Sequence, residues 1–155
     1  MTELPYKEGT VFSVPLKCGR KAWGVVARSA GGGVLCCYFF QSDPNSKVPQ
    51  CKPNPENAVA AFRVGDLYLL NGRWDIVGVI NPWKRKQWPI PFFIRRDILR
   101  PIAWEVDYGD NPNSIPQERR ISLSADLPED GLYGAGAAET YLGRILCRKV
   151  EDDKR

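Results

Sequence analysis

Short runs of β-branched and aromatic residues, separated by glycine-containing turns, dominate the first forty residues of the chain. The runs are TVFSVPL (10–16), KAWGVVARS (21–29) and GGVLCCYFF (32–40). Such runs are typical of strands, and the glycines at positions 31 to 33 can adopt the positive φ angles of a tight hairpin. The N-terminal part is therefore predicted to be an antiparallel β-meander.

The rest of the chain predicts a mixture of strands, loops and two helices. Residues 41–57 contain four prolines and read as a long surface loop. Residues 55–66 are predicted to form a short helix, with Asn54 as its N-cap and Pro55 at its first position. Strands are expected within 71–80, 92–97 and 102–110. A C-terminal helix is predicted from apolar residues at helical spacing, namely Ala138, Tyr141, Leu142, Ile145 and Leu146.

These elements favour an α+β fold in which β-structure dominates. We expect a curved, mainly antiparallel sheet or partial barrel with the C-terminal helix packed on it. The composition changes nowhere sharply enough to mark a second domain. A single domain is therefore expected over residues 1–150, followed by a frayed charged tail at 151–155.

Histidine is absent from the chain. Imidazole is the usual general base near neutral pH and the commonest metal-ligating side chain. Its absence excludes Ser-His-Asp and Cys-His catalysis and any zinc centre built from histidine. The remaining carboxylate, lysine, cysteine and tyrosine side chains form no recognisable catalytic motif, so we expect no enzymatic activity, no metal and no cofactor.

Five cysteines are present, Cys18, Cys36, Cys37, Cys51 and Cys147, without a C-x-x-C pair. An odd number in this arrangement is a poor disulfide framework, so we expect free thiols in a reducing compartment. Cys36 and Cys37 are neighbours in an expected strand and should point to opposite faces of the sheet. The N-terminus has no secretion-signal pattern and no apolar run reaches membrane-spanning length, which favours a cytoplasmic location and no membrane partner.

The segment WKRKQWPIPFFIRRD (83–97) combines two tryptophans, two phenylalanines, two prolines and five cationic side chains. Pro89 and Pro91 cannot donate hydrogen bonds within a sheet, so residues 88–91 are expected in a loop or at an edge. Three interpretations remain open: the tryptophans fill the core, the segment binds nucleic acid, or it contacts a protein, because tryptophan and arginine are enriched at binding hot spots. No RNA- or DNA-binding motif is present, so a nucleic-acid partner is not expected.

Charge is distributed unevenly along the chain. Residues 73–100 contain seven Lys/Arg and two Asp, a balance of +5, whereas residues 101–155 contain seven Lys/Arg and eleven Asp/Glu, a balance of −4. This polarity fits a surface complementary to a protein partner, pairing of the two segments within the fold, or charged faces in solvent. The sequence leaves these three alternatives open.

Several ordered blocks of the sequence resemble one family. The blocks are YKEGTVFSVPL, AWGVVAR, YFF, GDLYLLNGRWDIVG, WKRKQWPIPFFIRRD and DGLYGAGAAE. Between Tyr6 and Leu146 the chain resembles the bacterial immunity protein 26 family, some members of which also carry a phosphotriesterase label. The family's pattern falls on Gly65, Asp66, Gly72, Trp74, Trp83, Trp88, Pro89, Phe92 or Phe93, and Arg95 or Arg96. Family members often carry acidic residues where this chain has Lys84 and Gln87.

The resemblance implies an immunity protein, encoded beside a polymorphic toxin, that binds and neutralises a cognate toxin domain. Such a protein needs a stable scaffold and a complementary surface, and a few buried anchors suffice for tight binding. The expected anchors are the aromatic and cationic residues of the 83–97 segment, Trp83, Arg85, Trp88, Arg95 and Arg96. The 41–57 loop is expected to be a second contact element, and the oligomeric state stays open.

Two other functions remain as alternatives. A metal-dependent phosphotriesterase, as the family's second label implies, would need a metal-activated water. Without histidine its metal ligands would be carboxylates such as Asp66, Glu105, Asp107 and Asp110, which suit hard cations. The third function is an interaction module unrelated to toxins.

Overall fold

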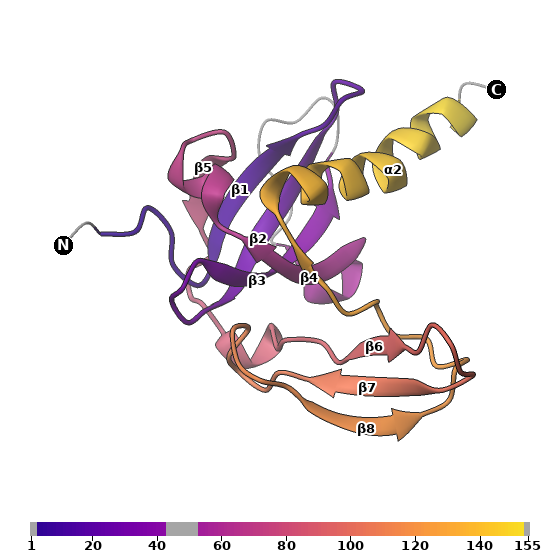
Figure 1. Cartoon of the computed structure of the whole chain (residues 1–155). Helices are drawn as coiled ribbons and strands as arrows, with labels where there is room; N and C mark the ends of the chain where they lie inside the picture. The colour runs from indigo at the N-terminus through magenta and orange to yellow at the C-terminus, as the bar shows by residue number, and fades with distance from the viewer. Residues whose placement is uncertain (1–2, 43–52, 154–155) are drawn as a thin grey trace.

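The computed structural model describes residues 3–42 and 53–153, with side chains described up to residue 147 (Figure 1). A six-stranded sheet has the order β5-β1-β2-β3-β4-β9, and a three-stranded sheet has the order β6-β7-β8. The first sheet contains β1 (Thr10–Pro15), β2 (Lys21–Ser29), β3 (Val34–Gln41), β4 (Ala60–Gly65), β5 (Asp75–Val79) and β9 (Leu132–Tyr133), and the second contains β6 (Phe93–Arg96), β7 (Ala103–Asp107) and β8 (Gln117–Ile121). All neighbours are antiparallel except β4 and β9.

The predicted N-terminal meander is confirmed. Strands β1, β2 and β3 pair in succession, and the β2–β3 connection contains three glycines with φ angles of +89°, +72° and +76°. Only glycine adopts this region without strain. Cys36 and Cys37 lie on opposite faces of β3, because Cys36 packs with Ile90 and Phe93 whereas Cys37 packs with the core beneath the C-terminal helix.

The long C-terminal helix α2 (Ala135–Asp153) covers one face of the six-stranded sheet (Figure 1). Its buried residues Ala138, Leu142 and Leu146 lie at the predicted helical spacing and contact the same core as Phe12 and Trp74. The helix is confirmed, and it includes residues 151–153 of the expected tail, while residues 154–155 lie outside the described part. None of the described helices is both long and apolar enough to span a bilayer.

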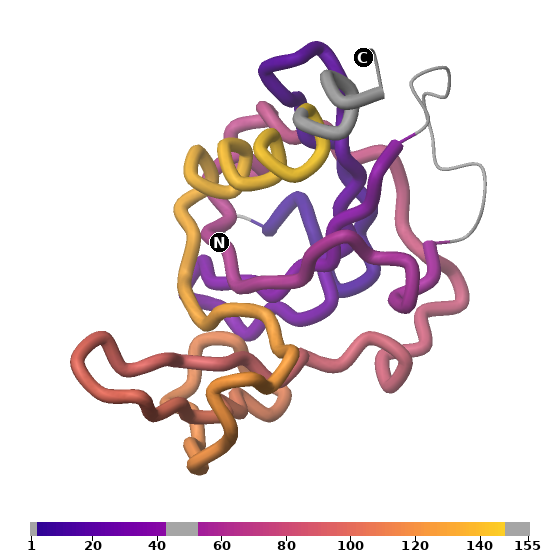
Figure 2. The backbone as a smooth tube through the Cα atoms, turned by 90° about the vertical axis from the view of Figure 1, so that its right-hand side faces the viewer, coloured from indigo at the N-terminus to yellow at the C-terminus, as the bar shows by residue number. Residues whose placement is uncertain are grey.

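The three-stranded sheet projects from the main body as an arm, which we define as residues 93–121 (Figures 1 and 2). A small apolar cluster joins the two parts. In it Ile90, Phe93, Val106 and Tyr108 from the arm and its approach pack against Cys36 of β3. The sheets do not close into a barrel, so the α+β, β-dominant prediction is confirmed in the form of an open curved sheet with an added arm.

The helix predicted for residues 55–66 is wrong beyond its first turn. Asn54 does cap a turn, since its side chain accepts a hydrogen bond of 3.1 Å from the Glu56 backbone, but only the short 3-10 helix η1 (Pro55–Asn57) follows. Residues of β4 then pair with β3, with Phe62 and Val64 buried on one face. Pairing with a neighbouring strand outweighs helix propensity here. A short helix, α1 (Leu67–Leu70), was missed.

The prediction of free cysteines is wrong for one pair. Cys18, in the β1–β2 turn, forms a disulfide with Cys147 of α2, with a Cα–Cα distance of 5.8 Å. The partners are 129 residues apart in sequence, so no spacing pattern could reveal them. Cys36 and Cys37 are free and buried, as expected, and Cys51 lies outside the described residues.

Candidate functional site

The segment 83–97 connects the two sheets. It crosses the face of the six-stranded sheet opposite α2, forms the short 3-10 helix η2 (Arg85–Gln87), and enters the arm as β6. Between these elements the residues around Pro89 and Pro91 form no strand, which confirms the loop expected from proline. The five predicted anchors are thereby divided into two groups. Trp83, Arg85 and Trp88 lie on the main body, and Arg95 and Arg96 lie on the arm.

Trp88 belongs to the core of the protein. Only 3% of its surface is exposed, and its ring makes edge contacts with Tyr38 and Phe40 of β3 at centroid distances of 5.2 and 6.1 Å. Trp83 is half-buried and stacks on Trp88 at 5.6 Å. Trp83 also lies against Gly9, where an added Cβ would meet the indole at 3.1 Å. The two tryptophans therefore form a rigid layer in which Trp83 is the outer member.

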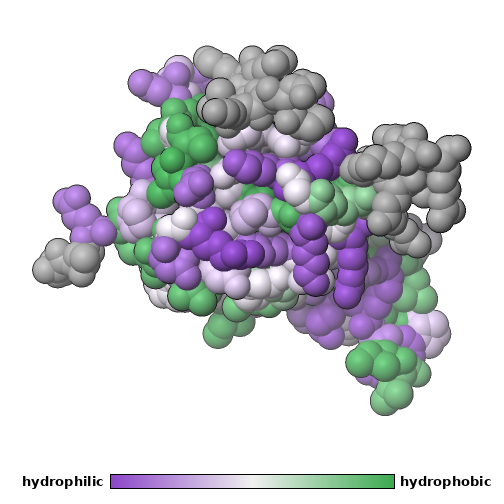
Figure 3. Space-filling model, turned by 90° about the horizontal axis from the view of Figure 1, so that it is seen from above, coloured by the Kyte–Doolittle hydropathy of each residue, from purple (hydrophilic) through white to green (hydrophobic). Residues whose placement is uncertain are grey.

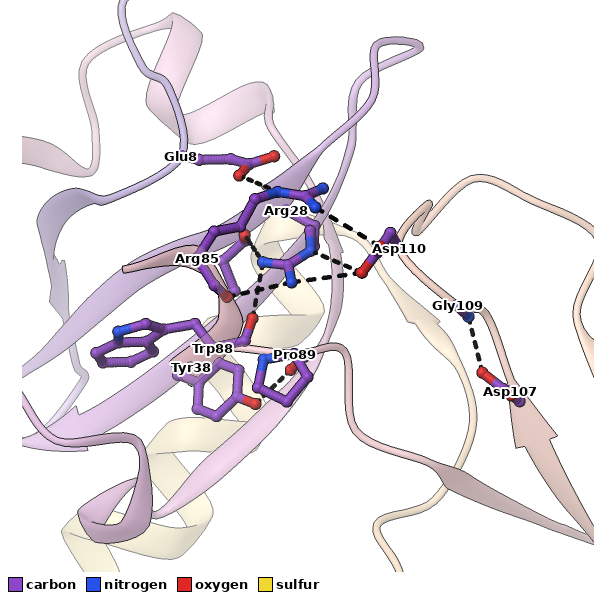
Figure 4. A network of polar contacts seen from close by, with 10 residues as sticks. Glu8, Arg28, Tyr38, Arg85, Trp88, Pro89, Asp107, Gly109 and Asp110 are labelled. Carbon is purple, nitrogen blue, oxygen red and sulfur yellow. Dashed lines mark hydrogen bonds and ion pairs between the residues drawn. The ribbon is translucent and has the colours of Figure 1, made fainter. Parts of the chain in front are cut away.

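Arg28 of β2 holds this layer in place (Figure 4). Its side chain is buried, and its guanidinium donates hydrogen bonds to the backbone carbonyl of Trp88 at 2.8 Å and to that of Arg85 at 3.2 Å. Asp110, from the arm, accepts from the same group at 3.4 Å. Buried polar groups of this kind must be paired to be tolerated. One buried cation thus connects β2, the η2 segment and the arm.

Arg85 extends from the same network toward solvent. Its Nε donates to Glu8 at 2.7 Å, and its guanidinium lies 3.6 Å from Asp110. The hydrogen bond with Glu8 raises the pKa of Arg85 above its ordinary value. The side chain is nonetheless 44% exposed. Arg85 is therefore oriented by two carboxylates and still accessible.

Arg95 and Arg96 occupy opposite faces of the arm, because neighbouring residues in a strand alternate. Arg95 makes a bidentate pair with Glu118 of β8, at 3.0 and 2.7 Å, and this hydrogen bonding raises its pKa. Its guanidinium also lies 5.8 Å from the ring centroid of Trp104. Arg96 pairs with Glu129 on the other face. Each of the two arginines thus has a carboxylate that fixes its direction.

Ion pairs between the basic and the acidic segment favour one of the three explanations given for the uneven charge distribution, namely pairing within the fold. Four ion pairs, Arg73–Glu139, Arg85–Asp110, Arg95–Glu118 and Arg96–Glu129, connect the basic segment 73–100 with the acidic segment 101–155. The two segments therefore pair within the fold. Surface pairs of this type contribute little to stability, about 0–1 kcal/mol each. Their main effect here is to orient the arginine side chains.

The four carboxylates that a phosphotriesterase would need, Asp66, Glu105, Asp107 and Asp110, do not converge. Their partners are, in that order, the Tyr6 hydroxyl, the Arg119 side chain, a backbone N–H and the arginine network. In the part of the chain that the structure describes, no three acidic, cysteine or histidine side chains gather as a metal site. The arrangement thus gives no support to metal-assisted hydrolysis.

A groove of about 860 Å³ lies between η1 and the 80–89 segment. Its floor includes Tyr38 and Trp88, and Lys84 and Gln87 stand among its lining residues. Pro53 to Glu56, from the end of the predicted 41–57 loop, form its other side. Residues 43–52 of that loop lie outside the described residues. The described end of the loop thus adjoins the tryptophan layer.

Sequence reasoning missed two features of this region. Arg28 gave no signal, because a lone arginine in a strand normally reads as solvent-exposed. Trp104 was assigned to a strand but not to a surface, although Arg95 and Arg120 lie over its ring at 5.8 and 5.6 Å. Cross-strand pairing explains this cluster, since Trp104 is opposite both arginines. The register of the arm could not be read from the sequence.

Three further positions of the family pattern, Trp74, Asp66 and Gly72, serve the fold. Trp74 is buried, stacks on Phe12 at 5.3 Å and donates its indole N–H to Glu139. Asp66 accepts a 2.6 Å hydrogen bond from the Tyr6 hydroxyl. Gly72 has a φ of +82°, which favours glycine. These residues therefore build the scaffold beneath the site.

Fold and site together define a small β-rich protein that presents arginines on a rigid tryptophan-backed support. The chain belongs to the immunity protein 26 family, whose model matches residues 7–104. Membership implies an immunity role in polymorphic toxin systems, and immunity proteins are generally not enzymes. The matched range ends within β7 and is shorter than the range from Tyr6 to Leu146 over which the resemblance was expected. No curated protein and no solved structure matches the chain significantly.

Proposed function

We propose that this chain neutralises one cognate toxin domain by binding it directly, with exposed arginines as the main contacts. The observation that carries the proposal is the state of Arg85 and Arg95. Carboxylates hold both side chains in one direction, yet 44% and 45% of their surfaces are exposed. Donors that are already oriented lose little conformational entropy on binding.

The arginines retain donors for a partner. A guanidinium group has five N–H donors, and the bidentate pair of Arg95 with Glu118 uses two of them. Arginine in such a setting recognises carboxylates and carbonyls with defined geometry. Trp83 adds an apolar contact, because its side chain is only partly buried. Interfaces of ordinary size need only a few anchors of this kind.

The five expected anchors take different roles in this proposal. Trp83, Arg85, Arg95 and Arg96 contact the toxin. Trp88, being buried, acts by supporting Trp83. The described end of the 41–57 loop lies beside the same layer and forms a second contact element.

The test is the double variant Arg85→Ala/Arg95→Ala, assayed with the toxin domain encoded by the neighbouring gene. Both side chains are exposed, so the fold should be kept within about 1 kcal/mol. The dissociation constant is expected to rise about 100-fold, since two hot-spot arginines are lost. Binding is measured by calorimetry with purified proteins, and protection by co-expression. A variant at Trp88 would be unsuitable because it would disturb the core.

Arg73→Ala is the matched control. Arg73 is also half-exposed and also paired, with Glu139 at 2.7 Å, but it lies on the α2 side of the six-stranded sheet. The Arg73→Ala variant should bind the toxin as tightly as the wild type does. Full protection by the folded double variant would exclude Arg85 and Arg95 as the main toxin contacts. If the wild type did not bind the toxin at all, the proposed function itself would be rejected.

A further inference from the structure

The turn between β6 and β7, at the outer end of the arm, exposes two adjacent aliphatic side chains. Ile98 is 97% exposed and Leu99 is 92% exposed, although neither serves the core. Figure 2 shows this connection reaching away from the body, and in Figure 3 the projecting part at the lower right ends in apolar surface. Single exposed aliphatic residues are common on proteins, but adjacent ones form a contiguous apolar patch, and such patches can mark interaction sites.

The turn holds this pair rigidly. The Asp97 side chain accepts hydrogen bonds from the backbone N–H groups of Leu99, at 2.8 Å, and Arg100, at 3.2 Å. The Arg100 guanidinium donates to the same carboxylate at 3.2 Å. The Asp97 N–H donates to the Ile102 carbonyl at 3.0 Å and closes the turn. The two aliphatic side chains are therefore displayed by a defined backbone and not by a loose loop.

Two cationic side chains near the apolar tip are available to a partner. Arg95 and Arg96 are balanced within the fold by Glu118 and Glu129, which leaves Arg100 and Arg120. Arg100 is 71% exposed despite its pair with Asp97. Arg120, across the sheet over Trp104, has no carboxylate within 4 Å among the described residues. A complementary partner would therefore offer apolar surface for the tip and carboxylates placed beside it for Arg100 and Arg120.

We propose that the tip of the arm inserts Ile98 and Leu99 into an apolar pocket of the cognate toxin domain whose rim carries carboxylates. This inference rests on the proposed function and names the chemistry of the partner surface. Buried anchors surrounded by a polar rim are the usual arrangement of tight interfaces. The arm supplies both parts, with the aliphatic pair at its end and arginines beside it. Arg95, already proposed as a contact, lies on the same strand hairpin.

The experiment compares the wild type with Ile98→Ser/Leu99→Ser in calorimetric binding to the toxin domain encoded by the neighbouring gene. Both side chains are almost fully exposed, so thermal unfolding should be unchanged. The dissociation constant is expected to rise about 100-fold or more, because two large aliphatic side chains lose their burial. Ile115→Ser is the matched control, since Ile115 is 95% exposed but lies in the β7–β8 connection, at the other end of the arm.

The outcomes separate the two levels of the proposal. If the wild type binds the toxin and the double variant binds equally well, the tip is not an anchor and the inference fails while the proposed function stands. If the wild type does not bind, both fail. Two further measurements test whether the tip instead binds a membrane or a second copy of the chain. They are co-sedimentation with phosphatidylglycerol vesicles and sedimentation velocity of the protein alone. Tip-dependent binding to vesicles, or a tip-dependent dimer, would overturn the inference in favour of a membrane or a second copy.

Discussion

At the residue scale, Arg28 organises the site without being exposed. Only 2% of its surface is accessible, and its guanidinium connects carbonyls of the η2 segment with Asp110 of the arm. A buried guanidinium is tolerated only when its donors are used. The position of the outer tryptophan therefore depends on a cation on the strand beneath it.

Replacing Arg28 by Met should destabilise the protein by about 2–4 kcal/mol. The carbonyls of Arg85 and Trp88 would lose a charged donor in a buried place, which costs more than a surface pair. Urea unfolding followed by tryptophan fluorescence measures the loss. Arg119→Met, which breaks the exposed pair with Glu105, should cost less than about 1 kcal/mol. Equal losses in the two variants would contradict the role of Arg28.

Single residues were only partly predictable from the sequence. The opposite orientation of Cys36 and Cys37 follows from strand alternation alone and was confirmed. The burial of Trp88 was left open, because strand β3, which it covers, is apolar on both faces and gives no information about what lies on it. Arg28 lies in a strand buried along nearly its whole length, so alternation could not assign its environment.

At the element scale, the disulfide connects the two ends of the fold. Cys18 lies in the first hairpin and Cys147 in the last helix, so the bond encloses almost the whole chain. Cross-links over long loops restrict the unfolded ensemble most strongly in the chain-entropy account. The helix α2 is thereby fastened at its C-terminal half to the sheet that its N-terminal half covers.

Cys18→Ser/Cys147→Ser should lower the free energy of unfolding by about 2–4 kcal/mol. The native fold should remain, since α2 keeps the buried contacts of Leu142 and Leu146. Urea unfolding measures the change, and the intact mass of the wild type before and after reduction checks the bond. If the reduced wild type and the double variant were as stable as the oxidised protein, the bond would contribute nothing.

Elements with an apolar pattern were predictable, and those without one were not. The meander and α2 have clear periodicity and were assigned correctly. Strand β8 consists of QERRI, with four exposed residues, and exists because β7 offers it a partner. Strand β4 carries the residues AAFRVG, which suit helix and strand alike, and pairing with β3 decided between them. The register of a strand and its pairing at a sheet edge depend on the neighbouring strand, so the local sequence alone does not predict them.

At the scale of the whole molecule, burial of acidic hydroxyl and thiol groups sets an alkaline limit to stability. Burial raises the pKa of Cys36 from 9.0 to about 12, and burial likewise raises the pKa of Tyr38 and Tyr108 from 10.0 to about 12. These groups stay neutral in the fold but ionise in the unfolded chain. Their stabilising contribution is therefore complete below pH 9 and is lost as pH rises from 9 through 12.

Unfolding free energy should consequently fall steadily above about pH 9. Cys36 contributes a loss on the order of 1 kcal/mol per pH unit in this window. Urea titrations between pH 7 and 11 measure the slope. A Cys36→Ala variant should be less stable at pH 7 but show a shallower decline. An identical slope in both proteins would mean that Cys36 does not carry the effect.

The ion pairs of the arginines cross the boundary of the family match. Arg95 lies inside residues 7–104 and its partner Glu118 lies beyond that range, whereas Arg85 pairs with Glu8 inside the range and with Asp110 beyond it. A substitution at position 118 would turn the guanidinium of Arg95 without altering any matched residue. If the exposed arginines contact the toxin as proposed, related chains can keep one scaffold and differ in the direction of these arginines, through the carboxylates that pair with them.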